Sequence, residues 1–291
     1  MFPLGKWITR QFTEWLTHEP DRAANFTSLT NYERLCDEIK PGDIILVEGH
    51  SRVSKIIKLI TQSPWTHSML YLGNYHQLTM AGLAPASLSH YATSPQAHLI
   101  IEAVLGEGTI VTPLQKYKDE HLRICRPSSL TLQDRNKVLQ HTLGKIGYQY
   151  HTRQLFDLAR FLLPYSLIPG RWRSSLFRYH AGDSTQTICS SMLAEAFLSV
   201  HYPVLPVIEN TEQGLRFFKR NTKLFIPQDF DYSPYFDIIK YPFIGIDEIA
   251  AYRSLPWDEE GFVCNEQGDC TLPVVGSKDD NEIKQEIQQG V

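Results

Sequence analysis

The chain has 291 residues, of which 42% are hydrophobic and 21% are charged. This is an ordinary globular composition, which excludes a disordered or collagen-like chain, and the length suits one large domain or two small ones. The net charge of −4 argues against a general nucleic-acid binder, which needs a basic surface. Nine acidic and two basic residues fall within 258–291. The negative net charge of the chain therefore comes from this tail, and the rest of the chain is mildly basic.

The cysteine content indicates neither a disulfide framework nor a zinc site. The five cysteines are scattered and odd in number, and no CxxC pair occurs. We therefore expect a reducing compartment and no metal or other cofactor. Cys264 and Cys270, six residues apart in the acidic tail, are the pair that oxidation could join.

The N-terminus lacks the continuous apolar core of a secretory signal, and no stretch approaches the roughly 20 apolar residues of a membrane-spanning helix. We therefore expect a cytoplasmic protein. Apolar residues recur at helical spacing from Leu4 to Leu16. This helix either packs on the body or lies in a membrane interface, where Trp7 and Phe12 would be immersed.

Five short strands are predicted in the first half of the chain, at 43–48, 67–72, 99–104, 109–112 and 121–126. A short helix from Ser51 to Leu59 separates the first two, and 74–97 is predicted as a loop. From residue 131 the pattern turns helical, with helices ending before Gly147, at 154–163 and at 188–200. Strands first and helices later indicate an α+β fold, with a small antiparallel sheet or open barrel packed against helices.

Three residues have the chemistry of a nucleophilic site. Cys189 falls at the start of the predicted helix 188–200, where backbone N–H groups favour a thiolate. His67 opens a strand and is a candidate base for it. Glu102 is the lone carboxylate of an apolar strand and is suited to orient an imidazole. The alternatives are a small buried cysteine, a surface histidine, and a strand-edge glutamate paired with an arginine.

Several segments resemble the permuted papain-like amidases of the YaeF/YiiX type, which are relatives of the NlpC/P60 hydrolases. The match spans about 40–240 and rests on PGDIILVEGHSRVSKIIKLITQSPWTHSMLYLG, LIIEAVLGEG and ICSSMLAEAF. The resemblance implies a circularly permuted papain-like fold, with Cys189 as nucleophile, His67 as base and Glu102 as the residue that orients it.

The resemblance divides the chain into three predicted parts. They are an N-terminal amphipathic helical extension (1–39), a permuted catalytic domain (40–240), and a C-terminal wrap with an acidic flexible tail (241–291). A basic, aromatic insert at 151–180 precedes the nucleophile helix. It is predicted as a helical hairpin with a solvated face, a lid, or a lipid-headgroup patch that includes Arg171 and Trp172.

Three functions remain open at this stage. The first is a cysteine hydrolase that cleaves amide bonds of a peptide or small molecule through an acyl-enzyme. The second is a lipid-directed thioesterase, phospholipase or acyltransferase at a membrane surface, since relatives of the lecithin:retinol acyltransferase group use a similar cysteine. The third is a binding module that keeps the fold without catalysis. Tyr148 and Tyr150 are candidate helpers of an oxyanion hole, and no nucleic-acid partner is expected.

Overall fold

The computed structural model falls into two units, one of residues 1–19 with 28–243 and one of 20–27 with 244–291. The first unit is described mainly over 30–83, 96–104, 106–148, 188–212 and 214–241, together with residues 11, 14–15, 17–18, 28, 88 and 94. The second is described at 251–255, 263–264 and 270–271. The insert 151–180, the predicted helix 154–163 and the residues Trp7, Phe12, Arg171 and Trp172 lie outside the described residues.

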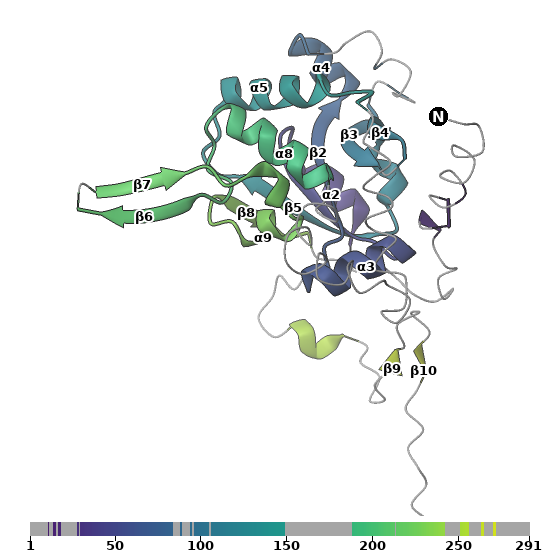
Figure 1. Ribbon diagram of the computed structural model, residues 1–291. Coiled ribbons are helices and arrows are strands. Elements are labelled where there is room, and N and C mark those ends of the chain that lie inside the picture. The colour runs from purple at the N-terminus through teal and green to yellow at the C-terminus, as the bar shows by residue number, and fades with distance from the viewer. Residues whose placement is uncertain are drawn as a thin grey trace, which may run out of the picture. The chain divides into compact units, whose positions relative to one another are not determined.

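A six-stranded antiparallel sheet forms the centre of the first unit, in the order β4-β3-β2-β1-β5-β8 (Figure 1). The strands are β1 (Ile44–Glu48), β2 (His67–Asn74), β3 (His98–Val104), β4 (Gly108–Pro113), β5 (His121–Pro127) and β8 (Phe236–Ile239). The α+β fold class is therefore confirmed, and the strands form an open sheet rather than a closed barrel. The sixth strand, β8, was not predicted.

Both faces of this sheet are buried, which explains why its central strand reads as a continuous apolar run. Ile44 and Leu46 of β1 belong to one core, and Ile45 and Val47 belong to the other, because successive side chains of a strand point to opposite faces. Helices α5 (Leu132–Leu143) and α8 (Ile188–Ser199) pack against each other over the first face. Leu35 of α2 (Tyr32–Glu38) belongs to the second core.

The remaining short helices lie between or beside the strands. They are α3 (Arg52–Thr61), α4 (Tyr75–Met80), η2 (Leu114–Tyr117), η4 (Thr222–Leu224) and α9 (Gln228–Tyr232). Helix α4 corrects the prediction of a loop over 74–97. Asn74 accepts from the backbone of Gln77, whose side chain bonds back to the Asn74 N–H, and this capping box starts a helix in a polar segment.

Strands β6 (Val207–Thr211) and β7 (Gly214–Phe218) form a separate hairpin that projects from the body (Figure 1). Its apolar side chains are exposed, including Ile208, Leu215 and Phe217. The sequence analysis missed this hairpin, because neither face is buried and no in–out alternation of hydrophobicity marks the strands.

The described part of the second unit holds η5 (Ala251–Ser254), β9 (Val263–Cys264) and β10 (Cys270–Thr271). The two strands are antiparallel, and their register sets Cys264 opposite Cys270 on the backbone. No helix in the described part of the chain is long and apolar enough to cross a membrane.

Candidate active site

The candidate site lies where two neighbouring strands of the sheet diverge. The β2–β3 ladder ends at the Leu70–Ile101 pair, whereas β2 stays paired with β1 as far as His67 and β3 stays paired with β4 as far as Val104. The first turn of α8 meets β2 there, since the hydroxyls of Ser68 and Ser190 are 3.0 Å apart. The divergence gives a helix N-terminus access to side chains of both strands.

His67 and Glu102 face each other across this opening. The Nε2 atom of His67 lies 2.8 Å from Oε2 of Glu102, which leaves Nδ1 as the ring nitrogen available to a thiol. The His67 side chain is 21% exposed and that of Glu102 is fully buried. The carboxylate therefore fixes the ring orientation of a histidine that still reaches solvent.

Cys189 is the second residue of α8, and its side chain is buried. Its sulfur is hydrogen-bonded to His67 and to the side chain and backbone of Ser68. The structure thus brings Cys189, His67 and Glu102 into one connected set. Their catalytic roles remain predictions.

Charges within the set favour a thiolate and an imidazolium. Burial opposes the ionisation of Cys189, but the positive charge and hydrogen bond of His67, with the bonds from Ser68, lower the pKa of the thiol. Burial likewise disfavours the charged form of His67, but Cys189 and Glu102 raise its pKa to about 10. These directions are those that a nucleophilic cysteine requires.

The Glu102 carboxylate has three further donors besides His67. Thr112 Oγ1 (2.9 Å) and Lys116 Nζ (3.1 Å) donate to Oε1, and Tyr117 Oη (2.5 Å) donates to Oε2. Burial would raise the pKa of Glu102, but His67, Lys116 and Tyr117 lower it to about 2. The carboxylate is therefore ionised at neutral pH, as a buried charge with full hydrogen bonding can be.

Sequence reasoning missed Ser68, Thr112, Lys116 and Tyr117. Ser68 follows His67 directly, so its nearness to the thiol was readable once His67 was chosen. Thr112 lies in β4, and Lys116 and Tyr117 lie in η2 directly after it. These three approach Glu102 only because β4 pairs with β3, a tertiary contact without a local sequence signal. Among the described residues, the cationic partners of Glu102 are His67 and Lys116 rather than the arginine considered as an alternative.

The remaining candidate residues are the neighbour of Cys189 in α8 and the two tyrosines considered for an oxyanion hole. Ser190 is buried and bonded to Ser68, so its hydroxyl joins the first turn of α8 to β2. Tyr148 is exposed, and the ammonium of Lys145 lies 5.7 Å from its ring centroid. Tyr150 lies outside the described residues.

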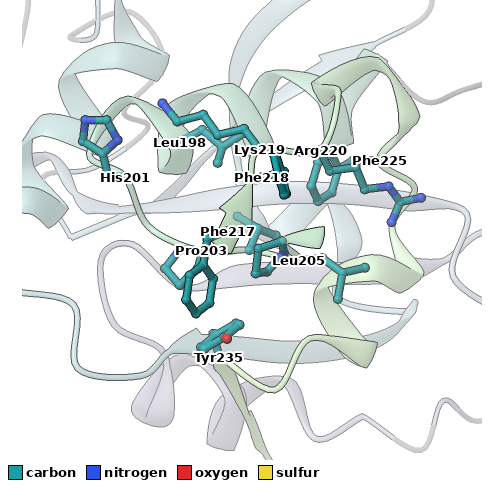
Figure 2. A pocket seen from close by; sticks show the side chains of 12 residues that line it. Leu198, His201, Pro203, Leu205, Phe217, Phe218, Lys219, Arg220, Phe225 and Tyr235 are labelled. Atoms are coloured by element: carbon teal, nitrogen blue, oxygen red, sulfur yellow. The ribbon is translucent and has the colours of Figure 1, made fainter. Parts of the chain in front are cut away.

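An apolar cavity lies elsewhere, where the β6–β7 hairpin meets the body. It measures about 500 Å³, and its lining is mostly apolar. Figure 2 shows Phe217 and Phe218 of the hairpin around it, together with Leu198 near the end of α8 and Phe225. Cys189, His67 and Glu102 do not line this cavity.

Comparison with known proteins finds similarity among solved structures. No protein-family model matches the sequence, and no curated protein matches it. One similar structure is described as "Crystal structure of metalloprotein yiiX from Escherichia coli O157:H7, DUF1105". It shares 15% sequence identity with this chain at a TM-score of 0.40, and the match covers 69% of this chain and 96% of that chain.

The description as a metalloprotein belongs to that similar protein. In the part of this chain that the structure describes, no group of three or more His, Cys, Asp or Glu side chains is placed to hold a metal ion.

Proposed function

We propose that this chain is a cysteine hydrolase that cleaves amide bonds, on a circularly permuted papain-like fold. The observation that carries the proposal is the connected set of Cys189, His67 and Glu102, with the sulfur bonded to a histidine whose Nε2 is held by a buried carboxylate. The chain order His, Glu, Cys is the order that a permutation of a papain-like enzyme produces. Peptides and small amides are the proposed substrates.

The proposed reaction uses the thiolate and imidazolium as a pair. The Cys189 thiolate attacks the carbonyl carbon, and the oxyanion forms near the backbone N–H groups of the first turn of α8. His67 then gives its proton to the leaving nitrogen, the C–N bond breaks, and an acyl-enzyme remains. Neutral His67 next takes a proton from water, the hydroxide attacks the thioester, and the acid product leaves with the ion pair restored.

Glu102 supports both proton transfers without taking a proton itself. Its hydrogen bond to Nε2 sets the ring so that Nδ1 faces the thiol, and its negative charge stabilises the imidazolium. His67, Lys116 and Tyr117 lower the pKa of Glu102 to about 2, so the carboxylate is ionised while it faces the imidazolium.

An acyl-enzyme experiment tests this proposal. The full chain is mixed with an activated acyl ester and with a panel of peptide and acyl amides, and the adduct is located by peptide mass spectrometry. We expect acylation at Cys189 and amide turnover that disappears in Cys189→Ala. The matched control is Cys125→Ala, because Cys125 is also buried but lies on β5. Turnover that survives in Cys189→Ala would refute the proposal.

A second candidate, lipid-directed acyl chemistry at a membrane surface, is favoured by the β6–β7 hairpin. Phe217 and Phe218 are exposed beside Lys219, and the adjoining cavity is apolar. Apolar and basic residues together suit a lipid interface. Release of fatty acid from phospholipid vesicles, lost in Cys189→Ala, would favour this candidate over amide hydrolysis.

A further inference from the structure

Glu102 accepts more hydrogen bonds than the orientation of a histidine requires. One bond from His67 Nε2 is enough to set the ring, yet Thr112, Lys116 and Tyr117 bind the same carboxylate. All three belong to the short stretch from the end of β4 through η2. One continuous segment therefore supplies three of the four side-chain donors to this carboxylate.

Tyr117 contacts both members of the histidine–carboxylate pair. Its hydroxyl donates to Oε2 of Glu102, the oxygen that also bonds His67. Its ring stacks on the imidazole, with ring centroids 6.3 Å apart and planes inclined by 29°. Lys116 joins the group, because its ammonium bonds Oε1 and also lies 5.1 Å from the Tyr117 ring centroid.

Donors that share one carboxylate divide its negative charge among them. A hydrogen bond from a phenol or an ammonium makes the carboxylate a weaker acceptor for the imidazolium beside it. That matters for a general acid, because a histidine held too firmly in its charged form releases its proton slowly at neutral pH.

We propose that Lys116 and Tyr117 are positioning residues that limit how strongly Glu102 holds the His67 imidazolium, so that His67 can release its proton to a leaving group. The catalytic meaning of this inference rests on the proposed function. The electrostatic part does not, since it concerns only the proton affinity of His67. Tyr117 has the larger effect, because Lys116 is 48% exposed and solvent screens its charge.

Within the described part of the chain, the titratable groups that face His67 and Glu102 are Cys189 from α8 and Lys116 and Tyr117 from η2. Beyond them Glu120 acts on Tyr117 and is bonded to His50. The tests below leave Cys189, Glu120 and His50 unchanged, so any shift in His67 is assignable to the η2 residues.

The experiment follows the protonation of His67 by NMR, in full-length protein carrying ¹³C-labelled histidine. The His67 signal is assigned by its absence from His67→Gln. We expect Tyr117→Phe to move the His67 titration midpoint to higher pH by about half to one unit, and Lys116→Met by less. Lys116→Arg keeps the charge and should restore the wild-type midpoint.

Two control variants separate this effect from loss of structure. Tyr202→Phe removes a phenol that donates to the carbonyls of Ser128 and Tyr235, far along the chain from His67. Lys118→Met removes an exposed charge two residues from Lys116. Both should leave the midpoint unchanged, even where Tyr202→Phe lowers the melting temperature.

The inference fails if Tyr117→Phe and Lys116→Met leave the His67 midpoint in place or lower it. It also fails if Tyr202→Phe moves the midpoint as far, since the shift would then report loosened packing. Absence of amide turnover in a protein whose midpoints shift as expected would refute the proposed function alone.

Discussion

The two ends of helix α8 have opposite character. At its start, Cys189 and Ser190 are buried, and their side chains are hydrogen-bonded to residues of β2. Near its end, Leu198 borders an apolar cavity of about 500 Å³ that the hairpin completes. Cys189, His67 and Glu102 therefore do not line this cavity, which lies toward the opposite end of the helix.

Satisfied polar contacts, and not an adjoining cavity, distinguish the start of the helix from its end. A buried carboxylate with four donors is costly to build and stays only where its partners are fixed. An apolar cavity beside exposed side chains needs no such arrangement. The predictions below separate the two ends by activity, stability and pH.

The largest expected effect is on turnover. Cys189→Ala should lower amide hydrolysis by about a thousandfold or more, since it removes the nucleophile. Phe217→Ala at the other end of the helix should keep the wild-type rate on soluble amides. The measurement is the initial rate of hydrolysis for both variants beside wild type. A large loss in Phe217→Ala on a soluble substrate would erase the distinction between the ends.

The next effect is on stability. Phe197 is fully buried, with its ring centroid 5.4 Å from that of Phe236, so Phe197→Ala should lower the free energy of unfolding by about 3–5 kcal/mol. Phe217 is 59% exposed, and Phe217→Ala should change it by no more than about 0.5 kcal/mol. Urea unfolding measures both. Equal losses would mean that the hairpin belongs to the core.

The Cys189 end of the helix should contribute to the pH dependence of stability through His67 and Glu102. The pKa of His67 is raised from 6.5 to about 10, so its contribution is full below pH 6.5 and is lost as the pH rises through 10. The pKa of Glu102 is lowered from 4.5 to about 2, so its contribution is present above pH 4.5 and is lost as the pH falls through 2. Both contributions are complete between pH 4.5 and 6.5.

Urea unfolding at about pH 6 and about pH 9.5 checks this sign. The stability difference between wild type and His67→Gln should shrink at the higher pH, although His67 and Cys189 titrate as a coupled pair. The difference between wild type and Phe217→Ala should stay constant. A His67→Gln difference that grows with pH would mean that the histidine is held neutral.

The smallest effect concerns the hydrogen bonds from Ser68. Its hydroxyl lowers the pKa of the Cys189 thiol, so Ser68→Ala should raise that pKa and slow alkylation at neutral pH by less than about tenfold. The backbone bond from Ser68 survives the substitution. Alkylation kinetics measure the change, and Ser54→Ala, at another buried serine, is the control. An alkylation rate unchanged from wild type would mean that the Ser68 hydroxyl contacts Ser190 without affecting the Cys189 thiol.

The local hydrophobic pattern of the sequence predicted the strands and the helix that hold the candidate site. It did not predict the side chains that only tertiary contacts bring to the site. The apolar run at 43–48 is β1, since both faces of this strand are buried. The helical spacing of apolar residues after Ile188 is α8. His67 and Glu102 could be selected from the sequence because each is a polar residue at the start of, or within, an apolar strand. The carboxylate's other donors were not readable, because Lys116 and Tyr117 reach Glu102 only through the pairing of β3 with β4.

The most direct test of the central claim is the alkylation of Cys189 by iodoacetamide across pH, read by peptide mass spectrometry in wild type and His67→Ala. The account predicts that Cys189 reacts faster than Cys36 and Cys125 below the ordinary thiol pKa of about 8.5, because burial raises the pKa of both other thiols. It also predicts that His67→Ala removes this advantage. Alkylation of Cys189 no faster than that of Cys36, or only after unfolding, would contradict the account.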